Sequence, residues 1–434
     1  MSTLTLGVVA FGAVLLLTAL RMPLAFALGV VGAVGTGLLK GWSVFLYVGG
    51  SAPFNVLNNY ALSVLPLFVL MGALAVHTGL AADLVRVANS FLGHYRGGLA
   101  MGGVAACAIF GAVSGSNIAT LSTMSRITVP EMLRRGYSPK LAAGTLASAS
   151  TLDILIPPSI PMVIYATMTE TSLGRLFAAG MVPGVVLTVM FAAAIWIWAR
   201  IDPAIAPRGE RLPWRGRLIQ LKDIVGVFAV FLLMLGGMYA GWFSPTEAAA
   251  VGAFGILVVG ILQRSLTWQG FVASVREAVG LSAVIYLILI GITLFHLLMD
   301  TIGVNREVSE YLAHLQLPPA AVMTIILIGL ILLGCVMDST SILFITTPFL
   351  FPVIVSLGYD GVWFGIVMTM VIQIGLIHPP FGLNVFILSA MIKEVTVAEA
   401  FWGCVPFLIA SLFMIVIICV YPEFILWLPN RLFG

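Results

Sequence analysis

Charged residues are scarce in this chain of 434 residues, where Asp, Glu, Lys and Arg together occupy 9% of the positions. Soluble domains carry about 25% of such residues. Hydrophobic residues make up 61% of the sequence, and the mean hydropathy is +1.14. This balance excludes a soluble globular protein and predicts an all-α polytopic membrane protein in a lipid bilayer. The net charge of +3 is small, and we expect no nucleic-acid partner.

Cysteine is also rare, and several functional motifs are missing. The basic start and cleavage site of a signal peptide are absent, so residues 4–20 are expected to form the first span. The sequence lacks a Walker loop, a His-Glu-x-x-His motif and paired aspartates on one helix. These absences argue against an enzyme, and we expect no cofactor. Without metal-ligand spacing, the four cysteines are interpreted as packing residues: Cys107, Cys335, Cys404 and Cys419.

A polar break lies inside one of the apolar tracts. The tract 98–125 is too short for two spans of about 20 residues each, and its middle, 111–117, consists mostly of small and hydroxyl residues with two glycines. Two arms of about 10 to 13 residues would reach the midplane of a bilayer core about 30 Å thick. The tract therefore predicts a re-entrant hairpin. Non-helical backbone at that depth is tolerated only when it is buried in protein or lines a wet cavity, so the tip is a candidate ligand or ion site.

Prolines interrupt the next apolar run, 141–167. Pro157, Pro158 and Pro161 fall in its middle, and because proline removes an amide donor and clashes with the preceding turn, the span is expected to unwind there and restart as a half-helix. Asp153 precedes this break, where a shift of one helical turn would bring it to water. Three polar or charged stretches are expected between the spans: 40–59, the loop with Arg86, His94 and Arg96, and the loop 126–140.

The second half of the chain repeats the landmarks of the first at a shift of about 222 positions. A second polar break, 334–341, lies in the apolar tract 320–351 and predicts a second hairpin. The sequence thus predicts two copies of one unit, 1–199 and 223–425, joined by a linker at 200–222. The recurring landmarks are these pairs: Pro23 and Pro245, Pro130 and Pro352, Tyr137 and Tyr359, Pro157 and Pro379, and Pro158 and Pro380.

The distribution of basic residues indicates how the two units are oriented. If each unit has five spans, one of them broken by prolines, and one hairpin, consecutive units have inverted topology and both termini share one side of the membrane. Sixteen of the twenty Lys and Arg residues then lie on the side of the linker. Because basic residues favour the cytoplasmic side, the linker is predicted to be cytoplasmic and both termini periplasmic. Both hairpin tips and both broken helices would lie near the midplane, at the interface between the repeats.

Five short motifs follow one another along the chain: 114–116 (Ser-Gly-Ser), 130–132 (Pro-Glu-Met), 156–159 (Ile-Pro-Pro-Ser), 180–184 (Gly-Met-Val-Pro-Gly) and 244–248 (Ser-Pro-Thr-Glu-Ala). In their order and spacing they resemble the large membrane subunit of tripartite ATP-independent periplasmic (TRAP) transporters. The resemblance covers nearly the whole chain and implies a sodium-driven elevator-type importer of organic acids, usually carboxylates such as C4-dicarboxylates, in the bacterial inner membrane. It also implies two partners, a small four-helix membrane subunit and a soluble periplasmic substrate-binding protein.

Sodium is expected to bind at the hairpin tips and helix breaks, where freed backbone carbonyls and hydroxyl groups supply hard oxygen ligands. One predicted site combines the first tip with the first break: Ser114, Gly115, Ser116 and Asn117 with Pro157, Pro158 and Ser159. The symmetric site combines the second tip with the second break: Asp338, Ser339 and Thr340 with His378, Pro379 and Pro380.

The anionic substrate is expected at the same level of the membrane, held by backbone amides and the positive ends of half-helices. The resemblance points to Ser114, Ser159 and Asp338 as substrate ligands, and Ser116 and Asn117 are added from their place at the tip. Simpler interpretations stay open: Ser114 and Ser116 could satisfy backbone groups of the turn, and Ser159 could be an N-cap.

Two further residues and two other classes of transport protein bear on the importer hypothesis. Glu247 is interpreted as part of a capping box with Ser244, and His378 could be an ordinary core residue. A stand-alone ion-coupled symporter or antiporter would share the hairpins and lack the partners. A channel fits less well, because broken helices and closed hairpin tips suit alternating access better than a continuous pore.

Overall fold

The computed structural model describes residues 3–304, 307, 318–334 and 339–433. The elements in these ranges are all helices, and six of these helices are long and apolar enough to cross a membrane. The prediction of an all-α polytopic membrane protein is confirmed. The first half contains α1 (Thr3–Ala19), α2 (Leu24–Lys40), α3 (Trp42–Leu57), η1 (Tyr60–Ser63), α4 (Val64–His77), α5 (Leu80–Leu92), α6 (Gly98–Ser114), α7 (Asn117–Arg134), α8 (Pro139–Ala149), η2 (Ser150–Ile154), α9 (Ile160–Thr169), α10 (Leu173–Ile201) and η3 (Pro203–Ile205).

The second half is built from a similar series of helices. They are α11 (Trp214–Tyr239), α12 (Pro245–Leu262), α13 (Trp268–Ile302), α15 (Pro319–Gly334), α16 (Ser339–Ser356), α17 (Gly361–Gly375), α18 (Leu383–Met391), α19 (Val397–Val420) and α20 (Glu423–Phe433). The predicted capping box is present at the start of α12, where the side chains of Ser244 and Glu247 bond each other's backbone amides. The predicted linker is helical at its end, because α11 begins at Trp214.

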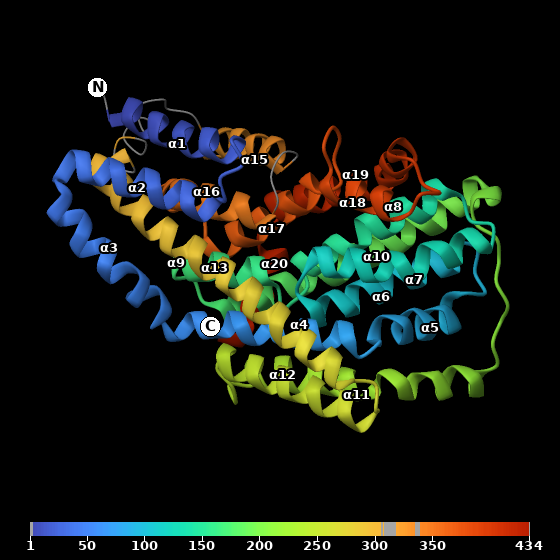
Figure 1. Cartoon of the computed structure of the whole chain (residues 1–434). Helices are drawn as coiled ribbons and strands as arrows, with labels where there is room; N and C mark the ends of the chain where they lie inside the picture. Colours follow the sequence, from blue (N-terminus) through green and yellow to red (C-terminus); the bar gives the residue numbers. More distant parts are fainter. Residues whose placement is uncertain (1–2, 305–306, 308–317, 335–338, 434) are drawn as a thin grey trace.

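The helices α6 and α7 form the first hairpin. Gly115 lies between them with φ of +60°, in the left-handed region that glycine adopts without strain. The second hairpin is formed by α15 and α16, on either side of residues 335–338, which lie outside the described part. Figure 1 shows α6 and α7 in its right half and α15 and α16 in its left half, so the hairpins approach the middle of the molecule from opposite sides.

The expectation of a loop at 126–140 is wrong for most of that stretch, because α7 continues to Arg134. Apolar residues at spacings of three to five, such as Met124, Val129 and Met132, are buried on one face of this helix. The charged residues that suggested a loop, including Arg126, are the exposed face of the same helix.

The expected polar stretch 40–59 and the charged loop after the next span are also largely helical. The first is mostly α3, which exposes large apolar side chains, with Tyr47 80% and Phe54 67% exposed. The second contains α5, an amphipathic helix that buries Leu84 and exposes Arg86. In both cases the scattered polar residues belong to one helix face, so they do not interrupt the helix.

The proline-broken helices are present in both halves. In the first, α8 and η2 end at Ile154 and α9 restarts at Ile160; in the second, α17 ends at Gly375 and α18 restarts at Leu383. These breaks confirm the prediction that each apolar run unwinds at its proline pair. The halves differ elsewhere, since α13 is continuous where α3 and α4 are separate. Asn59 accepts a hydrogen bond from the amide of Ala61 and starts a new turn there, which the corresponding Leu281 of α13 cannot do.

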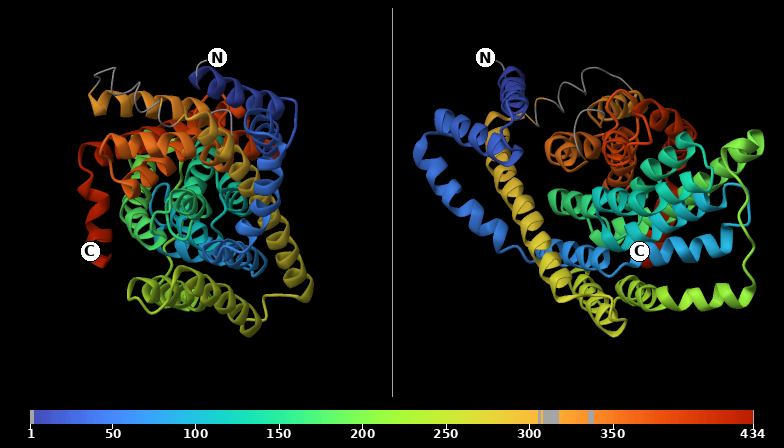
Figure 2. Two further views of the ribbon diagram at one scale, coloured as in Figure 1. Left: turned by 90° about the vertical axis from the view of Figure 1, so that its left-hand side faces the viewer. Right: turned by 45° about the vertical axis from the view of Figure 1, so that its right-hand side comes forward.

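The buried core includes the hairpin helices, the broken helices and the long helices α10 and α19, together with residues of α4, α5 and α13. The helices α8 and α19 meet backbone to backbone, since a Cβ atom added to Gly144 would overlap the carbonyl group of Gly403. Along one side of this core, α13 crosses the molecule diagonally with α2 packed against it (Figures 1 and 2). The helices α11 and α12 form the lower edge in both views of Figure 2.

Candidate functional site

A cavity of about 320 Å³ lies where the two hairpins, the two helix breaks and α13 meet, and we call it the central cavity. Its lining brings together segments that are far apart in the sequence, and none of the described side chains that line it carries a charge. The first hairpin and the first break contribute Gly115, Ser116, Asn117, Ile118, Ile154, Ile160 and Pro161. The second hairpin and the second break contribute Thr340, Ser341, Leu376 and Leu383, and α13 contributes Leu281, Val284, Ile285 and Ile288.

Hydroxyl groups organise the tip of the first hairpin. The Oγ atoms of Ser114 and Thr120 lie 2.8 Å apart and share a hydrogen bond. Ser116 is the N-cap of α7, and its Oγ accepts a hydrogen bond of 3.4 Å from the amide of Ala119. Both hydroxyl groups therefore serve the turn itself. Ser116 also lines the central cavity, whereas Ser114 is buried behind it.

The first tip lies directly against the first break. A Cβ atom added to Gly115 would lie 3.2 Å from the carbonyl oxygen of Pro158, and Pro157 and Pro158 are buried. Ser159 occupies the N-cap position of α9, but its side chain does not cap that helix. Its Oγ donates a hydrogen bond of 2.7 Å to the carbonyl of Ile154 on the other side of the break. The residues predicted for the first ion site are thus close together around backbone carbonyls.

The second predicted site is only partly within the described residues, because Asp338 lies outside them. Thr340 lines the central cavity beside Ser341, and α16 begins at Ser339. The second break differs from the first in burial, since His378 is half-buried and Pro379 is exposed. Residues on both sides of this break reach the cavity, so Thr340 and the second break face the same space.

Asn384, near the start of α18, is a site residue that sequence reasoning missed. Its side-chain amide and that of Asn117 exchange two hydrogen bonds, of 2.8 and 3.0 Å. The Asn384 amide nitrogen also lies 3.0 Å from the carbonyl of Ala147 and 3.1 Å from the Oγ of Ser150. Both asparagines are buried. The sequence does contain a signal for Asn384, because it is an amide side chain within an apolar half-helix that restarts shortly after the proline pair.

Asp153 is fully buried, whereas the sequence left room for a position near water. Its Cβ would lie 2.5 Å from a Cβ atom added to Gly111 of the first hairpin, so the hairpin needs glycine at this point. Neither carboxyl oxygen has a hydrogen-bond partner of ordinary geometry within the described structure.

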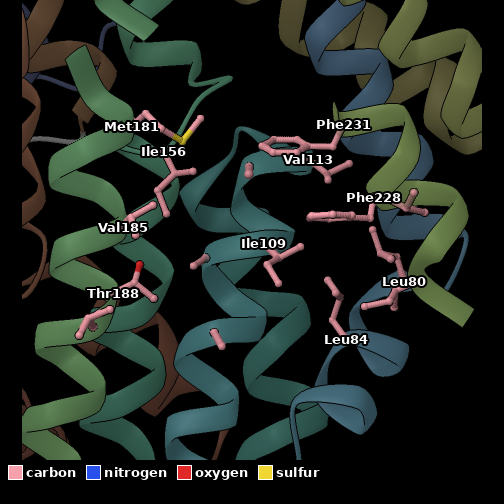
Figure 3. Close-up of a pocket in the computed structure, with 16 residues that line it drawn as sticks. Leu80, Leu84, Ile109, Val113, Ile156, Met181, Val185, Thr188, Phe228 and Phe231 are labelled. Atoms are coloured by element: carbon pink, nitrogen blue, oxygen red, sulfur yellow. The ribbon is translucent and has the colours of Figure 1, made fainter. Parts of the chain in front are cut away.

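A second cavity, of about 290 Å³, lies between α6 and α10 on one side and α5 and α11 on the other. Figure 3 shows that it is lined by apolar side chains such as Ile109, Val185 and Phe228. The hydroxyl group of Thr188, which also lines it, donates to the carbonyl of Gly184 at 2.7 Å. This cavity offers no free donor to a carboxylate, so the central cavity is the better candidate for a substrate site.

Comparisons with known proteins agree on one family. Residues 11–424 match the DctM component of tripartite ATP-independent periplasmic transporters. The chain is 35% identical over 380 residues to the C4-dicarboxylate TRAP transporter large permease protein DctM of Pseudomonas aeruginosa. The aligned region covers 87% of this chain and 88% of that protein. It is 33% identical over 445 residues to the protein of the same name from Rhodobacter capsulatus. That alignment covers 98% of this chain and 99% of the relative.

Among solved structures, the fold is similar to that of the Alcanivorax borkumensis YdaH transporter. The TM-score is 0.61 and the sequence identity 13%, over 88% of this chain and 89% of that one. At this identity the likeness concerns the fold alone.

Proposed function

Because this chain belongs to the DctM component family of TRAP transporters, we propose that it imports an organic acid by sodium-coupled secondary transport. The protein is the large permease subunit of such a system and not an enzyme. The observation that supports the proposal is the central cavity, which is lined by the tip of the first hairpin, the start of α16 in the second hairpin and residues beside both helix breaks. Such a convergence is the arrangement in which inverted-repeat transporters bind substrate and coupling ions.

The proposed substrate is a small carboxylate, of the C4-dicarboxylate type named for the two DctM relatives. A cavity of about 320 Å³ is at the small end of the range for ligand sites. Among the described residues, its polar lining is formed by the hydroxyl groups of Ser116, Thr340 and Ser341 and the amide of Asn117. The family resemblance implies that Ser114, Ser159 and Asp338 line the substrate site as well, and we keep these residues in the proposal.

Sodium ions are proposed to bind beside the substrate, at the hairpin tips and breaks. At the first site, the carbonyl of Pro158 faces Gly115, and the hydroxyl groups of Ser114 and Ser116 lie in the same turn. Carbonyl and hydroxyl oxygens suit a hard monovalent cation and add no negative charge that would repel a carboxylate. The second site is proposed around Asp338, Ser339, Thr340, His378 and Pro379.

The wider proposal concerns topology and partners. We propose inverted repeats at 1–199 and 223–425 that move substrate by an elevator motion, with a cytoplasmic linker and periplasmic termini in the bacterial inner membrane. The partners are a small four-helix membrane subunit and a periplasmic substrate-binding protein. The excess of basic residues on the linker side supports the orientation.

Uptake into proteoliposomes tests this function. The vesicles contain this chain and its small subunit, and the labelled probe is succinate, a four-carbon dicarboxylate, supplied with or without the binding protein. We expect accumulation only when an inward sodium gradient and the binding protein are both present. Uptake that does not depend on the binding protein would favour the alternative, a stand-alone symporter or antiporter. Uptake that does not depend on the sodium gradient would contradict the sodium coupling.

A further inference from the structure

A third cavity, of about 310 Å³, lies farther along α13 and has a mixed polar lining. We call it the outer cavity. The α13 residues of the central cavity are Leu281, Val284, Ile285 and Ile288, and those of the outer cavity are Leu289, Ile292, Thr293 and His296. Their spacing of three and four residues places both cavities on one face of α13. From Leu281 to His296 this face extends about 22 Å, at 1.5 Å per residue.

The opposite wall of the outer cavity is formed by the C-terminal turns of two helices. Asn55 and Val56 come from the last turn of α3, and Thr167 and Met168 come from the last turn of α9. The carbonyls in the last turn of a helix point towards its C-terminus and carry partial negative charge, although at the end of α3 the amides of Asn58 and Asn59 already donate to the carbonyls of Phe54 and Val56. Two such helix ends at one cavity favour a cation over a carboxylate.

The hydrogen bonds of the lining side chains also favour a cation as the ligand. Thr293 donates its hydroxyl proton to the carbonyl of Leu289 at 2.9 Å, and Thr167 donates its own to the carbonyl of Val163 at 2.9 Å. Their oxygens can therefore only accept from, or coordinate, a ligand. Asp300, an acidic residue one turn beyond His296 on α13, lies within electrostatic range of the His296 ring.

His296 contributes an unused polar atom to this cavity. Its Nε2 is buried and has no hydrogen-bond partner within the described structure. A buried polar atom without a partner is unfavourable unless a ligand or water supplies one. The mouth of the cavity is polar as well, because Asn55 and Asn59 are exposed there, and exposed amides favour water over hydrocarbon.

We propose that the outer cavity is a binding site for a monovalent cation, Na⁺ in the first place, that keeps part of its water shell. The cavity is much larger than a bare ion, so water fills the space between the cation and the oxygens of Thr167 and Thr293. This inference rests on the proposed sodium coupling and deepens it: the outer site would hold the coupling ion on the face of α13 that leads to the central cavity. It is separate from the predicted ion sites at the hairpin tips.

Nuclear magnetic resonance of the histidine rings tests this site directly, because the chain has five histidines. The full chain with its small subunit is labelled with ¹⁵N in the imidazole rings, placed in nanodiscs and titrated with NaCl. Choline chloride keeps the ionic strength constant. We expect a saturable shift of the resonance that His296→Gln removes. Equal shifts with choline alone, or no shift of that resonance, would overturn the proposal.

Matched variants separate direct binding from remote effects. Thr293→Val keeps the shape of the side chain and removes one oxygen. We therefore expect the sodium concentration at the midpoint of the titration to rise by about fivefold, which is the effect of losing one ligand of hydrogen-bond strength. Thr188→Val, in the apolar cavity, should leave the midpoint unchanged. The shift should persist in Ser116→Ala, whose alteration lies in the central cavity. An unchanged midpoint in Thr293→Val, or loss of the shift in Ser116→Ala, would contradict an independent outer site.

Succinate uptake by the same preparation keeps the two proposals distinguishable. Sodium-independent uptake together with a saturable His296 shift would refute the sodium coupling and leave the outer site standing. Sodium-dependent uptake without any His296 shift would refute the outer site and leave the proposed function standing.

Discussion

Two asparagine side chains hold the tip of the first hairpin to the restart of the second broken helix. Asn117 and Asn384 exchange two hydrogen bonds, and Asn384 also contacts the end of α8. A buried amide that loses its partner is left unsatisfied, which costs about 1 to 3 kcal/mol. This pair therefore fixes the relative position of segments from both halves at the edge of the central cavity.

Asn384→Ala is expected to reduce succinate uptake by about tenfold, the equivalent of about 1.4 kcal/mol in positioning the cavity wall. Because both residues act as one unit, the double variant with Asn117→Ala should transport no worse than the poorer single variant. Asn58→Ala, at an exposed asparagine, serves as the control and should transport normally. If the loss of uptake in the double variant equals the product of the losses in the two single variants, the two asparagines do not act as one unit.

Asp153 offers a second test at the residue scale, one of stability. Its carboxyl group is fully buried and has no hydrogen-bond partner of ordinary geometry within the described structure. Since a buried charge without a partner is unfavourable, Asp153→Asn should leave the thermal midpoint of the detergent-solubilised protein unchanged or raise it. A midpoint lowered by several degrees would show that the carboxylate is held by a bound partner.

At the scale of elements, the sequence predicted the breaks better than the helices around them. The first polar tip and both proline breaks could be predicted, because small, hydroxyl and proline residues are unfavourable within a continuous apolar helix and therefore mark the place where it ends. The lengths of α3, α5 and α7 were missed, because polar residues on one helix face look like a loop when they are read in a line. The pairing of Asn117 with Asn384 was beyond prediction, since nothing local links positions in different halves.

The packing of α8 against α19 should be highly sensitive to the addition of a single methyl group. The backbones meet at Gly144 and Gly403, so Gly144→Ala would push carbonyl atoms that cannot rotate away. We expect a loss of about 1 to 3 kcal/mol, measured as a lower thermal midpoint. Gly236→Ala is the matched control, because nothing lies within 4 Å of a Cβ atom there. Equal midpoints for the two variants would contradict the close contact.

At the scale of the whole molecule, the proposed inverted repeats predict on which side of the membrane the linker and the C-terminus lie. The linker, rich in basic residues, and the C-terminus should lie on opposite sides of the membrane. Alkaline phosphatase, which is active only in the periplasm, should be active when fused after Arg431 and inactive when inserted at Gly209. Green fluorescent protein should give the reverse pattern. Activity of the same reporter at both positions would contradict the proposed topology.

The central claim is that both hairpin tips line one substrate cavity, and cysteine protection tests it most directly. Ser116 and Thr340 come from different hairpins but line the same space. In a background without the four native cysteines, Ser116→Cys and Thr340→Cys are alkylated with N-ethylmaleimide at increasing succinate in the presence of sodium. Thr188→Cys, in the apolar cavity, is the control. We predict that succinate slows alkylation at both cavity positions with the same midpoint and leaves the control unaffected. Protection at only one position, or clearly different midpoints, would contradict a shared cavity.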